Sequence, residues 1–263
     1  MLTNPKRFFC HLVTKEFFLI VLCIISAAFS GSCTEQWTEI ELENWTYTGD
    51  VNITDKNGLV FEFEGEESSS SSSADIAGAV WNTYDFSKKK GLLISFKPQI
   101  LTYSSETGSG KYPYGFAIVF TSSSIVNLIG EKGAGNGYEG IMNAVVFEFD
   151  FFKHASNNDL NKPHFSVHYN VTGPVSSSSV GYDSKLVNQQ LPNFYDSSLD
   201  GYYKNIIFEI QLIGNRIIAK TNRGTVLVDH TFTGFQQLLE QTDVHVGITA
   251  SMKSERKDRK SVV

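Results

Sequence analysis

Two carboxylates lie two residues apart, at Glu148 and Asp150, in the apolar run that opens the segment Val145–His164. In a β-strand residues i and i+2 share a face, so both side chains can reach one ion. Burial of a carboxylate without a partner costs several kcal/mol, so a buried pair needs a neutralising group. A metal ion is one candidate for that group. Asp159 and His164 follow in the sequence, and their side chains are also of the kinds that bind metals.

Two other interpretations fit the same residues. Val146 shares the face of Glu148 and Asp150, and apolar side chains occupy the opposite face, which is ordinary alternation in a strand that has one solvent-facing side. A carboxylate pair also suits hydrolysis of glycosidic bonds, which requires two carboxyl groups flanking the bond. No second glutamate follows among residues 151–154, however, so we expect that the protein is not an enzyme.

The N-terminus is typical of a secretory signal peptide over residues 1–31. A basic lead-in precedes the apolar run Phe17–Phe29, which is shorter than the about 20 residues that span a bilayer. Cleavage near Ser30–Ser32 predicts a secreted protein or one in the lumen of the secretory pathway. An uncleaved anchor is the alternative, and it is the one route to membrane attachment that the sequence offers. Glycosylation sequons at Asn44, Asn52 and Asn170 agree with secretory passage.

The composition narrows the class of partner. The formal net charge is −6, which disfavours a nucleic-acid partner. Basic residues gather in residues 252–263, where acidic residues interrupt them, and a disordered, solvated tail is expected there. After signal cleavage only Cys33 remains, so the mature chain has no disulfide within it.

The sequence pattern of the remaining chain predicts strands joined by polar loops. Helical periodicity is nearly absent, and only Phe235–Gln241 predicts a turn or two of helix. Residues Asn205–Phe232 predict three strands joined by the tight turns Gly214–Asn215 and Arg223–Gly224. We therefore expect an all-β protein, a single β-sandwich of antiparallel sheets. The other predicted strands are Leu59–Gly65, Gly91–Ile100, Gly115–Phe120, Asn143–Phe152, His164–Asn170 and Val244–Ser251.

Four of these segments, in this order, resemble the L-type (legume-like) lectins. The resemblance runs from about Trp45 to Ser251 and implies the concanavalin-like jelly roll over residues 34–251. The four segments are the Gly-x-x-Trp block Ala77–Ile100, the strand Tyr112–Phe120, the glycine loop and metal strand Gly135–Phe152, and the closing strand Val244–Ser251.

The resemblance implies two neighbouring ions, a transition metal such as Mn²⁺ and a Ca²⁺. Its metal strand, Glu-x-Asp-x-(Phe/Tyr)-x-Asn followed by Asp and His, matches here at Glu148, Asp150, Phe152, Asp159 and His164. By that match Glu148, Asp150, Asp159 and His164 hold the transition metal. The two aspartates and the carbonyl of Phe152 hold calcium. The family's calcium-binding Asn falls at His154, which is a poor calcium ligand.

The implied function is binding of glycans or glycoproteins. The sugar site would lie over Phe152 and near Tyr114, Gly137, His154 and Ser251. The family's sugar-binding Asp falls at Tyr114, which lacks the carboxylate, so weak affinity is expected. Replacing Tyr114 by Asp together with His154 by Asn is therefore expected to raise affinity.

Two further expectations follow. The substitutions at Tyr114 and His154 keep open an alternative in which a degraded site serves as an adhesion or structural module that no longer binds sugar. Members of the family often dimerise through the back sheet, so the resemblance also allows a homodimer.

Overall fold

The structure is a computed structural model of the 263-residue chain. It describes residues 25–28, 37–39, 45–49, 74–84, 91–98, 100–101, 113–151, 163–178, 185–191, 195–196, 201–202, 206–232, 236–238, 240 and 244–254. The strands are β1 (Ile25–Ala28), β2 (Trp37–Glu39), β3 (Thr46–Gly49), β4 (Ala74–Tyr84), β5 (Gly91–Phe96), β6 (Ile100–Leu101), β7 (Pro113–Thr121), β8 (Met142–Asp150), β9 (His164–Pro174), β10 (Lys185–Gln190), β11 (Tyr195–Asp196), β12 (Gly201–Tyr202), β13 (Phe208–Ile213), β14 (Arg216–Thr221), β15 (Val226–Thr231) and β16 (Val244–Ser254).

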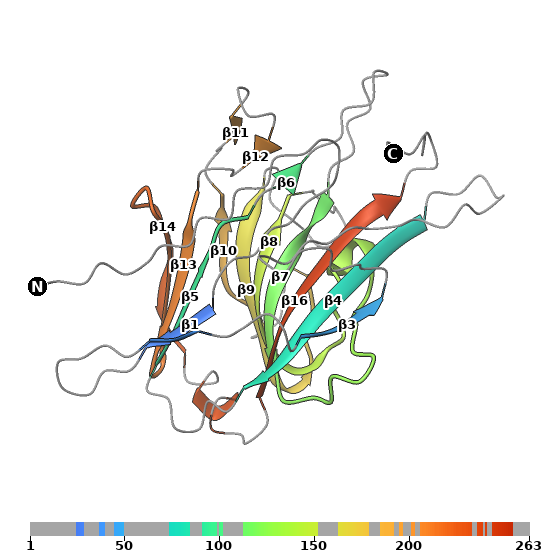
Figure 1. The fold of residues 1–263 in the computed structure, drawn as a ribbon, viewed down its shortest axis with the longest axis horizontal. Helices are drawn as coiled ribbons and strands as arrows, with labels where there is room; N and C mark the ends of the chain where they lie inside the picture. Colours follow the sequence, from blue (N-terminus) through green and yellow to red (C-terminus); the bar gives the residue numbers. More distant parts are fainter. Residues whose placement is uncertain are drawn as a thin grey trace, which may run out of the picture.

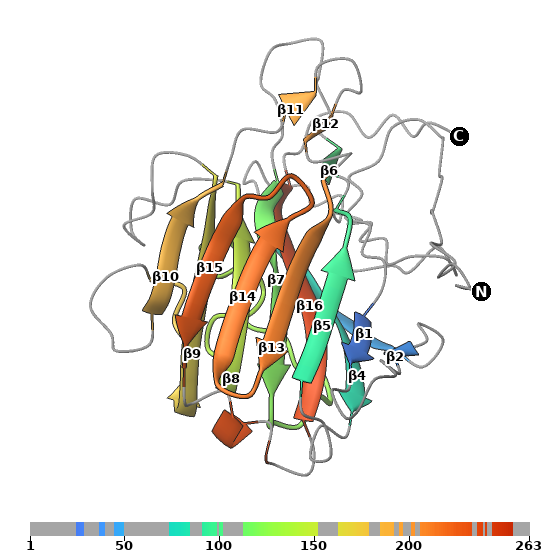
Figure 2. The same ribbon diagram turned by 90° about the vertical axis from the view of Figure 1, so that its left-hand side faces the viewer.

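Two large antiparallel sheets face each other, as the all-β sandwich prediction required (Figure 1). One sheet has the strand order β10-β9-β8-β7-β16-β4-β3, and the other has the order β15-β14-β13-β5-β1-β2. Turned by 90°, the six-stranded sheet lies in front of the seven-stranded sheet (Figure 2). A small third sheet, β11-β12-β6, lies at one end of the sandwich. The closing strand β16 is therefore central, because it pairs with both β4 and β7.

The sequence-based strand predictions are confirmed where the structure describes them, with one exception. The predicted strand Gly91–Ile100 ends at Phe96, and Ile100 begins β6 in the small third sheet. Strands β13, β14 and β15 occupy Asn205–Phe232 as predicted, and positive φ angles at Gly214 and Gly224 mark the two turns. Residues 236–238 are helical, within the predicted Phe235–Gln241 segment. The predicted strand Leu59–Gly65 lies outside the described residues.

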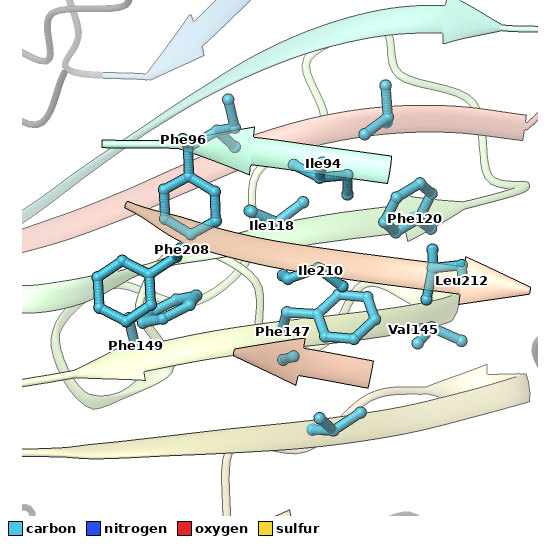
Figure 3. Close-up of a cluster of buried hydrophobic side chains, with 14 of the residues drawn as sticks. Ile94, Phe96, Ile118, Phe120, Val145, Phe147, Phe149, Phe208, Ile210 and Leu212 are labelled. Atoms are coloured by element: carbon cyan, nitrogen blue, oxygen red, sulfur yellow. The ribbon is translucent and has the colours of Figure 1, made fainter. Parts of the chain in front are cut away.

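The core fills the space between the two sheets with alternating side chains from both. Figure 3 shows Phe149 and its neighbours from β7 and β8 facing Phe96 of β5 and Phe208 of β13. The rings of Phe116 and Phe149 stack with centroids 4.7 Å apart, and Phe96 and Phe208 stack at 5.5 Å. Between the sheets, Phe149 lies edge-on to Phe96 and to Phe208, with ring centroids 5.4 and 5.1 Å apart. Aromatic pairs of this kind add about 0.5–1.5 kcal/mol to the free energy of area burial, so these contacts help hold the two sheets together.

A second apolar cluster covers the outer face of the seven-stranded sheet, the face turned away from the other sheet. Residues 122–141, which we call the covering segment, fold back over this face (Figure 1). Trp81 of β4 is buried there, and its Nε1–H donates to the carbonyl of Leu128 at 2.8 Å. The ring of Trp81 packs against Gly247 of β16, where a Cβ would lie 2.2 Å from the ring. The covering segment therefore shields side chains that a single-sided sheet would expose.

Two strands reach beyond residues 34–251, the range predicted for the domain. Residues Ile25–Ala28, inside the predicted signal peptide, form β1 and pair with β5 and β2. At the other end β16 continues to Ser254 and so enters the predicted tail 252–263. The described part of the chain has no helix long and apolar enough to cross a membrane.

Candidate functional site

Neighbouring antiparallel strands position the carboxylate pair and the histidine. On β8, Glu148 and Asp150 share the outer face with Val146 and Ala144 of the covered cluster. On β9, His164 is the register partner of Asp150, and Ser166 is the partner of Glu148. One potential ligand atom from each of Glu148, Asp150 and His164 lies within 4.8 Å of the others. The structure thus brings together three of the residues that the sequence predicted as metal ligands.

These three side chains are buried, which removes the solvent-facing interpretation of the alternation. Glu148 is 2 % exposed, and Asp150 and His164 are each 1 % exposed. The covering segment excludes water from a face that a one-layer sheet would leave open. The charges on this face must therefore be neutralised by neighbouring side chains or by a bound ion.

Two residues that the sequence did not single out hold the carboxylate of Glu148. Asn136, in the glycine loop Glu131–Gly140, donates from Nδ2 to Oε1 of Glu148 at 2.8 Å. His168, two residues beyond Ser166 on the same face of β9, has its Nε2 at 3.0 Å from Oε2. His164 and His168 are four residues apart, so they share one face of a strand, and this spacing could have predicted the second histidine. Asn136 carried no such signal, because its contact depends on how the glycine loop folds.

The local backbone explains how Asn136 reaches the strand. It follows the short 3₁₀ helix η2 (Gly133–Gly135) and has φ 46°, a left-handed conformation that Asn tolerates. Its carbonyl accepts a hydrogen bond from Thr249 Oγ1 of β16 at 2.8 Å, which ties the loop to the sheet. Opposite its amide lies Gly115 of β7, where a Cβ would be 3.1 Å from Nδ2 and 2.3 Å from the carbonyl oxygen of Phe149. Glycine at position 115 therefore allows the close approach.

The electrostatics of the cluster favour an ionised Glu148. Burial raises the pKa of its carboxyl, but the hydrogen bond and charge of His168, the charge of His164 and the Asn136 amide together lower it below the usual value. Beside it, burial and then the charge of Glu148 raise the pKa of Tyr138 well above its ordinary value. The site is therefore arranged around a negative charge, and Tyr138 stays neutral next to it.

The chemistry of the donor set fits a divalent transition metal. Two carboxylates and one imidazole suit ions such as Mn²⁺, whereas calcium prefers oxygen ligands only. Glu148 and Asp150 supply negative charge, and His164 supplies the nitrogen. The predicted ligands Phe152 and Asp159 lie outside the described residues, and so does His154.

The residues predicted to contact sugar have different environments. Ser251 and Gly137 are buried and have structural partners: Ser251 Oγ donates to the carbonyl of Ile76 and accepts from the N–H of Gly133, each at 2.8 Å. A Cβ on Gly137 would lie 3.3 Å from Thr249. Tyr114 is also largely buried, and its hydroxyl donates to Oδ1 of Asp75 at 2.9 Å.

Of the three predicted glycosylation sequons, the structure describes only Asn170, on β9. Its amide donates to the carbonyl of Pro174 at 2.9 Å, and its Oδ1 accepts from the N–H of Thr172 at 3.2 Å. Asn44 and Asn52 lie outside the described residues.

Comparison with solved structures places the fold among the legume lectins. A lectin from Bauhinia forficata in complex with GalNAc matches with TM-score 0.51 and 11% identity, covering 89% of this chain and 100% of that one. Lectin UEA-II complexed with galactose matches with TM-score 0.50 and 12% identity, covering 88% and 90%. The exoplasmic/lumenal domain of VIP36 in its Ca²⁺/Man3GlcNAc-bound form has TM-score 0.47, 15% identity and coverage of 83% and 89%. The predicted concanavalin-like jelly roll is therefore confirmed. No protein-family model and no curated protein match the sequence.

Proposed function

We propose that this protein is a secreted, non-catalytic carbohydrate-binding domain whose sugar site depends on bound metal. The observation that carries the proposal is the cluster of Glu148, Asp150 and His164, buried beneath the glycine loop in a legume-lectin fold. Lectins of this fold occur in complexes with GalNAc and with galactose. The proposed ligands are glycans of glycoproteins.

The metal would supply positive charge that neutralises the carboxylates and fixes the adjoining loop. We assign Glu148, Asp150 and His164 to a transition metal such as Mn²⁺, together with Asp159. The calcium ligands would be Asp150, Asp159 and the carbonyl of Phe152, with His154 or Asn157 completing the site poorly. The chain's own contribution is orientation, because Asn136 and His168 fix both oxygens of Glu148 in place.

The test is retention of the secreted protein on an immobilised high-mannose glycoprotein, with and without EDTA. We expect weak retention that EDTA abolishes and that Mn²⁺ with Ca²⁺ restores. Asp150→Asn should abolish retention. The matched control is Asp229→Asn, which removes an exposed carboxylate paired with Arg216 on the six-stranded sheet. Retention that survives EDTA and Asp150→Asn would exclude the metal-dependent site.

One observation favours a second function, a structural or adhesive module without sugar binding. Glu148 already has a hydrogen-bond partner on each oxygen, so the fold can hold this carboxylate without an ion. Retention on immobilised glycans distinguishes the two functions. A folded protein that binds no glycan of a broad panel, with or without added metal, supports the structural module.

A further inference from the structure

A β-bulge sets the position of Tyr114. Strand β7 pairs Gly115 with Ser251 and Pro113 with Met252 of β16, so Tyr114 is an extra residue without a partner in that register. On the other side of β7, the N–H of Phe151 donates a hydrogen bond to the carbonyl of Tyr114 at 2.8 Å. Regular alternation would place the side chain of Tyr114 on the inward face of β7, the face that carries Phe116. Bulges redirect side chains, and here the hydroxyl reaches Asp75 instead.

Asp75 lies on the outer face of the seven-stranded sheet, next to the glycine loop. It shares its side of β4 with Ala77 and Trp81, which pack under the covering segment. Unlike them Asp75 is exposed, so its carboxylate is open to a ligand. Within the described part of the chain, Tyr114 is the one hydrogen-bond partner of this carboxylate.

The glycine loop is shaped to admit this carboxylate. Gly133 has φ +65°, and a Cβ on it would lie 2.5 Å from Oδ2 of Asp75. Any side chain at position 133 would therefore displace the carboxylate. Gly133 is itself held in place, because its N–H donates to Ser251 Oγ at 2.8 Å. The loop, β4 and β7 thus converge on one exposed carboxylate.

We propose that Asp75 is the carboxylate that binds sugar hydroxyls in this protein, and that Tyr114 holds it in position. The inference rests on the proposed carbohydrate-binding function. An ionised carboxylate accepts about four hydrogen bonds, and the phenol uses one. The remaining acceptor sites suit a pair of adjacent hydroxyls on a neutral hexose. Anionic sugars are disfavoured, because their charge would meet that of Asp75.

The first test is Asp75→Asn in the full-length secreted protein, measured on high-mannose, asialo and sialylated glycans. Loss of a charged hydrogen-bond acceptor should weaken binding of the neutral glycans about tenfold or more. The midpoint of urea unfolding should stay unchanged, because the side chain is exposed. Tyr114→Phe keeps the ring but frees the carboxylate, and it should weaken binding about threefold to tenfold. Asp229→Asn serves as the control and should bind like the wild type.

A third variant reverses the expectation drawn from the sequence. Tyr114→Asp would place two carboxylates side by side at this point, so it should weaken glycan binding. If this variant binds more tightly, the sugar-binding carboxylate belongs at position 114 and the role of Asp75 is overturned. Wild-type binding that EDTA abolishes but Asp75→Asn leaves unchanged overturns the role of Asp75 and leaves the proposed function standing. No wild-type binding to any of the glycans overturns both.

Discussion

The Nδ2 of Asn136 lies 2.8 Å from Oε1 of Glu148, so one hydrogen bond joins the glycine loop to the strand that carries the carboxylate pair. The second oxygen of Glu148 faces Nε2 of His168 at 3.0 Å. Groups next to metal ligands commonly orient them. The position of the loop and the geometry of the proposed metal site are therefore linked through the side chain of Asn136.

Asn136→Ala should loosen both the fold and the site. A buried hydrogen bond to a charged group is worth about 1.5–3 kcal/mol, so the free energy of unfolding should fall by about that amount. Urea unfolding of the metal-free protein measures this loss. Gln236→Ala is the control, because Gln236 is exposed and bonds only to Glu240 among the described residues. If the two variants are equally stable, the hydrogen bond does not secure the loop.

Metal binding should raise thermal stability through Glu148 and Asp150. An ion that binds only the folded state adds about 2.7 kcal/mol at a concentration of a hundred times its Kd. We expect Mn²⁺ to raise the melting temperature of the wild type by several degrees, and Glu148→Gln to lose most of this shift. Asp229→Asn should keep it. An equal shift in all three proteins would assign the metal to another site.

The sequence predicted the strands of this site better than its contacts. Alternation along Asn143–Phe152 correctly gave Glu148 and Asp150 a common face, because that property depends only on the period of a strand. Their burial depends on the covering segment, which has no regular period. Asn136 lies 12 residues from Glu148 in the chain and meets it only after the loop has closed.

Tyr114 shows a second limit of reasoning from the sequence. Regular alternation from Phe116 would direct the side chain at position 114 to the inward face of β7. A single bulged residue interrupts this alternation. Its partner Asp75 is 39 residues away, on a strand that does not pair with β7. The sequence shows that position 114 has no carboxylate, but it does not show that the carboxylate of Asp75 lies beside Tyr114.

The contact between Trp81 and Gly247 should make position 247 intolerant of a side chain. A Cβ there would lie 2.2 Å from the buried indole, and overpacking of this kind costs about 1–3 kcal/mol. Gly247→Ala should lower the free energy of unfolding by at least this amount. In a Trp81→Leu background the same substitution should cost much less, which a double-mutant cycle measures. Additive effects would show that the two residues do not interact.

Two tyrosines should resist ionisation in the folded protein. Burial is the main cause that raises the pKa of both Tyr138 and Tyr114, and the charges of Glu148 and Asp75 add to it. Because both values lie above the unfolded value near 10, the neutral phenols stabilise the fold fully below that pH. This contribution is lost as pH rises above about 10 through the raised values, so stability should fall there.

Absorbance at 295 nm measures the ionisation of tyrosine directly, because the phenolate form absorbs at this wavelength. Tyr138→Phe should leave the titration of the folded protein unchanged below its alkaline unfolding, since Tyr138 contributes no signal there. In urea the same variant should lose the amplitude of one tyrosine out of the 11 in the sequence. A lower amplitude in the folded protein would show that Tyr138 ionises before unfolding.

Signal-peptide cleavage should remove strand β1 from the secreted protein. The predicted cut near Ser30–Ser32 lies beyond Ile25–Ala28, whose residues pair with Leu93 and Ile94 of β5. Intact mass and N-terminal sequencing after enzymatic deglycosylation should give a first residue close to Gly31. The edge of β5 would then lack this partner, which leaves backbone groups open for pairing with another strand. A secreted chain that retains Ile25 would contradict the cleavage and keep β1 as part of the six-stranded sheet.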